Sequence, residues 1–151
     1  MLLVKTFIKE SPIHGKGLFA DEDISEGTPI WKYSADTTSL IAAYDFINLC
    51  KQLSFKEILT YLTYSYLRND QVWHVLDNSK YINHGENSNI AFLDNFQEIA
   101  IRDIKKGEEL IENYHNCYDH NDFFNWDFCN IETKENALEL LYKNWKVPHY
   151  A

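Results

Sequence analysis

The segment YINHGENSN, residues 81–89, places three asparagines and a histidine directly after an apolar pair. Amide and imidazole groups are costly to bury without hydrogen-bond partners. Such a segment therefore serves either turn formation, in which side chains bond to the nearby backbone, or recognition of a ligand. Taken alone, residues 81–89 favour a turn.

Two further segments contain glycines and polar residues in patterns that are typical of turns or ligand-binding loops. The first is SPIHGKGLFA, residues 11–20, which fits the letters G-x-G-x-x-A of a dinucleotide-binding loop. That loop needs a strand running straight in and a helix starting at its end, whereas here Pro12 precedes it and Gly27 and Pro29 follow closely. We interpret it as a glycine loop that either turns the chain or lets backbone amides approach a ligand. The second is IKKGEELIENY, residues 104–114, which by itself predicts a hairpin with a charged turn.

Together, in this order and spacing, the three segments resemble the SET-domain family of protein lysine methyltransferases. Residues 11–20 followed by ISEG (24–27) look like its first motif, YINH with Asn89 looks like its R-F-I-N-H-S-C-x-P-N motif, and Gly107–Leu110 with Tyr114 looks like G-E-E-L-x-x-x-Y. The resemblance covers about residues 4–36 and 72–114. The residues between them correspond to the helical insert that varies within the family.

The resemblance implies a fold that is mostly β with helices, the SET-domain β-clip. It consists of small curled sheets of short strands, a helical insert, and a C-terminal pseudoknot and helix. We expect one SET domain over residues 1–151, with an N-terminal part at 4–36, the insert at 37–71, a C-terminal part at 72–114 and an extension at 115–151.

Hydrophobic spacing predicts the elements independently. Apolar residues recur every three or four positions over 39–51 and 54–68, which indicates two helices. Ser54 and Glu57 form the pattern of a capping box at the start of the second. A third helix is predicted over 133–144. Short apolar runs separated by polar turns predict strands at 1–9, 29–33, 72–76, 90–93, 99–101 and 110–111. Strands and helices do not alternate regularly, which argues against a doubly wound sheet.

The resemblance also implies the site. The catalytic residue would be Tyr114. The cofactor S-adenosyl-L-methionine, which leaves as S-adenosyl-L-homocysteine, would be held by Lys16, Gly17, Leu18, Tyr81, Asn83, His84 and Tyr114. The substrate channel would include Tyr81, Glu112 and Trp145. Methyl transfer needs a neutral, aligned and desolvated lysine amine rather than a metal, and an aromatic channel lowers the pKa of that lysine.

Three departures from the family pattern stand out. Glu112 occupies the position where many members carry a Phe or Tyr that influences the number of methyl groups added, so the sequence does not indicate that number. Gly85 and Ser88 replace the usual Ser and Pro. The zinc-binding cysteine tail is missing after Tyr114, and we expect no metal. The tail does contain the candidate ligands His115, Cys117, His120 and Cys129, which we interpret as part of a polar loop.

Composition limits the partners. The 151 residues carry a formal net charge of −9, which disfavours direct nucleic-acid binding. We expect instead a Lys/Arg-rich protein or peptide substrate, with histones among the candidates, drawn by acidic residues beside the motifs. A second copy of the chain, as a homodimer, is a further expected partner. Three cysteines and no apolar stretch of roughly 18–20 residues predict an intracellular protein without a membrane span, in the cytoplasm, in the nucleus or delivered into a host cell.

Two functions from different classes follow. The first is an S-adenosylmethionine-dependent protein-lysine N-methyltransferase, acting on a histone or on another protein such as a ribosomal one. The alternative is a catalytically inactive SET-like module that binds basic protein segments, a hypothesis motivated by the altered central motif and by Glu112.

Overall fold

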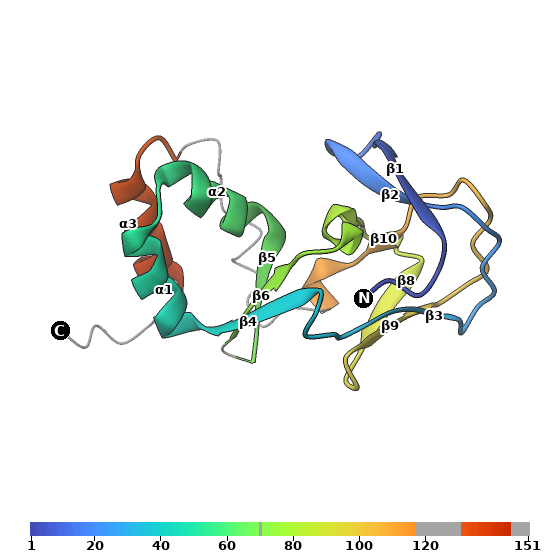
Figure 1. Cartoon of the computed structure of the whole chain (residues 1–151). Helices are drawn as coiled ribbons and strands as arrows, with labels where there is room; N and C mark the ends of the chain where they lie inside the picture. Colours follow the sequence, from blue (N-terminus) through green and yellow to red (C-terminus); the bar gives the residue numbers. More distant parts are fainter. Residues whose placement is uncertain (70, 117–130, 146–151) are drawn as a thin grey trace. The chain divides into compact units, whose positions relative to one another are not determined.

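The computed structural model describes residues 1–69, 71–116 and 131–145, excluding the side chains of Leu67 and of residues 143–145. The chain forms two compact units. Unit 1 comprises Met1–Thr38 and Val75–Cys117, and unit 2 comprises Ser39–His74 and Tyr118–Ala151. Small sheets of short strands and three described helices make up the two units (Figure 1), which confirms the expected fold class, mostly β with helices.

Unit 1 is built from two sheets. In the smaller one, β1 (Thr6–Glu10) pairs antiparallel with β2 (Lys16–Ala20). The larger has the order β3-β9-β8-β10-β7. Its strands are β3 (Pro29–Lys32), β7 (Asn83–His84), β8 (Ile90–Leu93), β9 (Gln97–Ala100) and β10 (Ile111–Glu112). β10 pairs in parallel with both β7 and β8. The strand of the final motif therefore lies between the strand that carries Asn83 and His84 and the strand that follows Asn89.

Burial of apolar side chains holds these strands together. The core of unit 1 contains Leu18, Ile30, Ile90, Ile104 and Leu110, each fully buried. Two short 3-10 turns, η1 (Asn78–Tyr81) and η2 (Tyr114–Asn116), precede β7 and follow β10. The strands that carry the central and final motifs, β7 and β10, are therefore each joined to a short helical turn.

Unit 2 combines a three-stranded sheet with helices. The sheet has the order β4-β6-β5, with β4 at Thr38–Ala42, β5 at Ser65–Arg68 and β6 at Gln71–Val75. The helices are α1 (Ala43–Gln52), α2 (Phe55–Tyr64) and α3 (Lys134–Trp145). Phe46, Ile47, Ile58, Leu62, Ala137 and Leu141 form its buried core. No helix among the described residues has the length and apolar character needed to cross a membrane.

All three predicted helices are present, but the predicted start of the first helix and the predicted end of the second are wrong. The capping box of Ser54 and Glu57 is confirmed at the start of α2, and a C-terminal helix is present. Residues 39–42, expected to be helical, form β4, and α2 ends at Tyr64 instead of continuing to 68. The cause is pairing with β6: Ser65 lies opposite His74, and the rings of Tyr66 and Trp73 stack 5.7 Å apart.

Candidate active site

One side-chain amide joins the three segments that the sequence singled out. Asn83, on β7, directs its Nδ2 toward the carbonyl oxygens of His14 (3.1 Å) and Lys16 (3.2 Å) and toward Glu109 Oε1 (2.9 Å). An amide nitrogen carries two hydrogens, so three acceptors exceed its donors by one. The glycine loop, the central motif and the final motif therefore meet in a cluster with spare acceptor capacity.

The glycine loop is shaped by contacts with Glu109. Ser11 donates a hydrogen bond from Oγ to Glu109 Oε2 (3.0 Å), while Glu109 Oε1 lies over Gly17. A Cβ at Gly17 would lie 2.2 Å from that oxygen, so a side chain at this position would displace the Glu109 carboxylate. Gly15 has a positive φ of 47°, which glycine adopts without strain. Sequence reasoning did not assign Glu109 to the site, although its motif position was the available signal.

Asn89 fixes the strand that leads to Tyr114. Its side chain is 1% exposed, donates from Nδ2 to the Glu109 carbonyl (2.7 Å), and accepts from the Ile111 amide through Oδ1 (2.8 Å). Both bonds replace backbone pairing at the start of β10. The second asparagine of the central motif thus has an architectural role in this structure.

Tyr114 is held at both ends of the residue. Its hydroxyl donates a hydrogen bond to the Ile82 carbonyl, and its backbone amide donates to His84 Nδ1 (3.1 Å). The rings of His84 and Tyr114 lie 5.2 Å apart, and the ring of His115 lies 4.9 Å from His84. Burial, followed by the nearby His115, lowers the pKa of His84. A neutral His84 retains the lone pair that accepts the Tyr114 amide hydrogen.

Glu112 faces another carboxyl group inside the protein. Its side chain is 3% exposed and hydrogen-bonds to Glu98 of β9, which is 7% exposed. Burial raises the pKa of Glu98 well above its ordinary value, and the charge of Glu112 adds to that increase. The pair therefore retains a proton at pH values where exposed glutamates are ionised.

The remaining predicted site residues have different surroundings. Lys16 is exposed at the start of β2, whereas Leu18 is fully buried and its carbonyl accepts from the Leu110 amide (2.8 Å). Tyr81 is half-buried at the end of η1. Trp145 ends α3, with its side chain outside the described part.

Of the candidate metal ligands in the tail, His115 lies in η2, while Cys117, His120 and Cys129 fall outside the described residues. The described residues contain no group of three His, Cys, Asp or Glu arranged to bind a metal.

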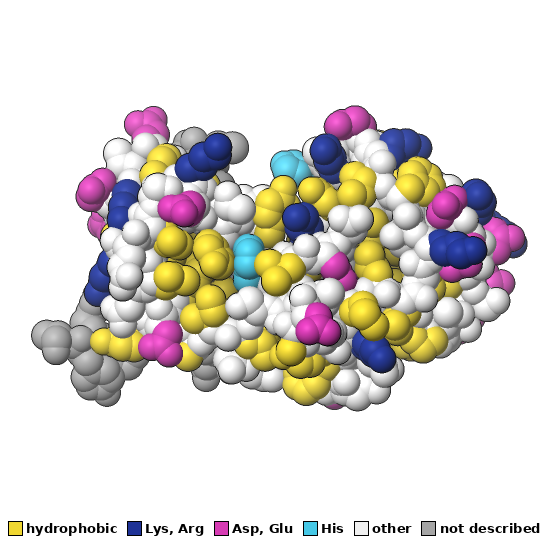
Figure 2. Space-filling model, in the orientation of Figure 1, with side chains coloured by type: hydrophobic (Ala, Val, Ile, Leu, Met, Phe, Trp, Pro, Cys, Tyr) yellow, Lys and Arg dark blue, Asp and Glu magenta, His cyan; other side chains and the backbone are white. Residues whose placement is uncertain are grey.

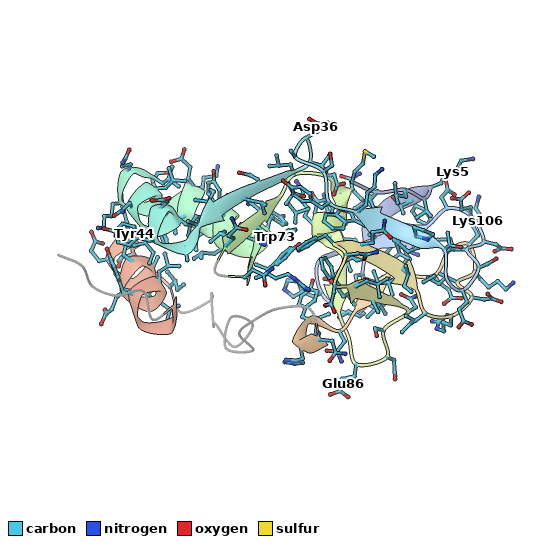
Figure 3. All side chains as sticks on the ribbon, turned by 90° about the horizontal axis from the view of Figure 1, so that it is seen from below. Lys5, Asp36, Tyr44, Trp73, Glu86 and Lys106 are labelled. Carbon is cyan, nitrogen blue, oxygen red and sulfur yellow. The ribbon has the colours of Figure 1, made fainter. Side chains whose placement is uncertain are left out.

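Charged side chains of both signs alternate on the visible surface of unit 1 (Figure 2). Lys106 pairs with Asp21 (3.0 Å), and Arg102 pairs with Glu108 (2.9 Å). Figure 3 shows Lys5 and Lys106 at one end of this unit, and Glu86 projecting away from the ribbon elsewhere. Two of the acidic side chains beside the motifs are thus paired locally, and Glu112 is buried.

The family follows from a direct match. The family model described as SET domain matches residues 15–115, which is most of the chain and includes Asn83, Glu109 and Tyr114. The chain belongs to the SET-domain family. A search of curated proteins gave no match.

Solved structures agree with this SET domain. One is described as ctPRC2 in complex with H3K27me3 and H3K27M, with 28% identity, a TM-score of 0.57, and coverage of 74% of this chain and 14% of that chain. Another is ctPRC2 in an autoinhibited conformation bound to S-adenosylmethionine, with 28% identity, a TM-score of 0.54, and coverage of 78% and 16%. The Chaetomium thermophilum polycomb repressive complex 2 gives 27% identity, a TM-score of 0.53, and coverage of 78% and 16%. This chain spans only a small part of the length of those proteins.

The hydrogen-bond acceptors around Asn83 suit the positive charges of the family's cofactor. S-adenosylmethionine carries a sulfonium and an α-ammonium, and both are cations. The cluster offers two backbone carbonyls and the Glu109 carboxylate, and the Asn83 amide can satisfy only two of these three acceptors. An ammonium group would supply the missing donor. The residues present therefore fit this cofactor.

Proposed function

We propose that this SET domain is an S-adenosylmethionine-dependent protein-lysine N-methyltransferase. The observation that carries the proposal is the meeting of all three motifs at the Asn83 amide, with Tyr114 tied to the adjoining residue Ile82. Solved relatives include a complex bound to S-adenosylmethionine and one bound to H3K27me3. We extend both features to this chain as part of the proposal.

The cofactor would lie against the glycine loop. Backbone groups of Lys16 and Gly17 and the side chain of Asn83 would hold its charged end, and His84 would flank it. The bound cofactor supplies a methyl group on a positively charged sulfur, which is an excellent leaving group. Leu18 can contribute only through its backbone, because its side chain is buried in the core.

Tyr114 would act through its oxygen. Since its hydroxyl hydrogen is donated to the Ile82 carbonyl, the oxygen presents lone pairs to any further neighbour. Lone pairs stabilise a cationic or positively polarised group, so Tyr114 would orient the reacting lysine amine and favour the charge distribution of the transfer. Aromatic walls around the lysine would favour its neutral form by excluding water, and we assign Tyr81 to this channel.

The substrate would be a lysine in a Lys/Arg-rich protein segment, with histone tails as the first class to test. Incubation with methyl-labelled S-adenosylmethionine and core histones or a cell lysate should label lysines. We expect Tyr114→Phe, which keeps the ring and removes the hydroxyl, to lower the rate at least about 100-fold. Tyr33→Phe, in the same unit but outside the site, should leave the rate unchanged.

The inactive-module hypothesis predicts a different result. A protein that binds S-adenosylmethionine by calorimetry, yet labels nothing in a broad lysate, would contradict the enzyme proposal. Loss of cofactor binding altogether would contradict it more directly, because the acceptor cluster at Asn83 would then have no ligand.

A further inference from the structure

A buried pair of carboxyl groups, Glu98 and Glu112, lies beside Tyr114 in the sequence and sheet order, and the channel role expected for Glu112 stays a prediction. Glu98 is on β9 and Glu112 is on β10, the outer neighbours of β8 on either side. Neighbouring strands lie about 4.8 Å apart, so β9 and β10 are separated by roughly 10 Å of sheet. Two glutamate side chains are long enough to meet across that gap.

The strand register places both side chains on one face of the sheet. Glu112 pairs with Ile90, and Glu98 pairs with Phe92. Ile90 and Phe92 are two positions apart on β8 and so point to the same side. The two carboxyl groups therefore meet above β8, in surroundings that leave them 3% and 7% exposed.

The contact between them needs a proton. Ionised carboxylates are acceptors only, so a hydrogen bond between two glutamates exists only while one of them is protonated. Other charged groups face this pair: the Met1 amino group, 3.6 Å from Asp77, and Asp77 itself act on Glu98, and Glu112 interacts with His84. Among the described residues, Glu98 Oε2 has no hydrogen-bond partner.

We propose that the Glu98–Glu112 bond is a latch that fixes the end of β10 and thereby positions Tyr114. β10 has only two residues, and Asn89 already holds the first, Ile111. Glu112 is the second, and Tyr114 follows two residues later with its amide bonded to His84. Glu98 and Glu112 are positioning residues in this proposal, which rests on the proposed function for the role of Tyr114.

The latch predicts a pH dependence that ordinary packing would not give. Burial and the charge of Glu112 raise the pKa of Glu98 above its ordinary value of 4.5. The folded protein then holds a proton that the unfolded chain releases above that pH, so rising pH disfavours the folded state until the folded-state pKa is reached. One proton corresponds to a tenfold change in the folding equilibrium constant per pH unit.

Three variants and a control test this inference in the full chain. Glu112→Leu removes the latch, Glu112→Gln and Glu98→Gln keep a hydrogen bond without the shared proton, and Glu26→Gln makes the same chemical change at an exposed turn of unit 1. Amide hydrogen exchange at Tyr114, followed by NMR, reports on the latch without any need for activity. We expect at least tenfold faster exchange in Glu112→Leu, and rates within twofold of wild type in both Gln variants and the control.

Kinetics and denaturation complete the test. In Glu112→Leu, kcat should fall at least tenfold while the affinity for S-adenosylmethionine changes less than threefold, and Glu112→Gln should restore most of kcat. As pH rises above 4.5, the wild-type folding constant should fall relative to that of Glu98→Gln, by at most tenfold per pH unit. Unchanged Tyr114 exchange in folded Glu112→Leu overturns the latch. If that variant does not fold, parallel pH curves for wild type and Glu98→Gln overturn it. Altered exchange in a protein that transfers no methyl group would support the latch and refute the proposed function.

Discussion

At Gly17, in the glycine loop, an added side chain would meet the Glu109 carboxylate. This carboxylate lies over the glycine and also accepts hydrogen bonds from Ser11 and Asn83. A methyl group at position 17 would displace that carboxylate and break at least one of the bonds. Since hydrogen bonds to charged groups contribute about 1.5–3 kcal/mol, we expect Gly17→Ala to lower the free energy of unfolding by about 1–3 kcal/mol in urea denaturation.

A double-mutant cycle isolates the cause. In a Glu109→Ala background the obstructing carboxylate is gone, so Gly17→Ala should have a much smaller effect there. Equal losses in the two backgrounds would show that the glycine is needed for another reason, such as the Phe19 ring, which would lie 3.1 Å from a Cβ at position 17.

His84 should make the protein sensitive to mild acid. Its pKa is lowered from its ordinary value of 6.5 by burial first and by His115 second. The unfolded chain therefore binds a proton more readily than the folded protein, and stability should decrease as pH falls below about 6.5. Denaturation curves of wild type and His84→Gln between pH 7.5 and pH 5.5 should diverge in that direction. Curves that stay parallel over this range would contradict the prediction.

The sequence predicts a secondary-structure feature correctly where all the residues that form the feature lie close together in the chain. The capping box of Ser54 and Glu57 is confirmed, and its hydrogen bonds join residues only three positions apart. We expect Ser54→Ala to lower the free energy of unfolding by about 1 kcal/mol, measured by chemical denaturation. Lys56→Ala, on the exposed side of the same helix, is the control and should change stability by less than about 0.5 kcal/mol. A similar loss in both variants would count against the cap.

Non-local pairing explains what the sequence did not show. Tyr66 follows Leu62 at helical spacing, yet pairing with Trp73 makes residues 65–68 a strand. The site divides in the same way. Motif spacing indicated Asn83 and Tyr114, and the position of Glu109 in the final motif was a further signal. The role of Glu98 depends instead on a contact with β10 that no local pattern encodes. Glu98 lies in the β8–β9 hairpin, whose sequence has no unusual feature. Its partner Glu112 is identified only by the order of strands in the folded sheet.

For the whole molecule, the net charge of −9 bears on the proposed substrate. Lys106 and Arg102 neutralise Asp21 and Glu108 near the motifs, and Glu112 is buried, so these three acidic side chains contribute little to attraction of a basic peptide. Most of the acidic excess nevertheless lies in unit 1, which carries the motifs. Attraction should therefore be long-ranged and easily screened.

Salt dependence tests that inference. The screening length is about 10 Å at 0.1 M salt and shortens as salt rises, so the KM for a Lys/Arg-rich peptide should increase severalfold between roughly 0.05 and 0.3 M NaCl. The kcat should change little, because salt screens the long-range attraction that brings the peptide to the protein rather than the chemical step. A peptide with the same target lysine and uncharged flanks is the matched control, and its KM should be nearly constant. If both peptides respond equally to salt, the charge of the protein does not recruit its substrate and acts only on solubility.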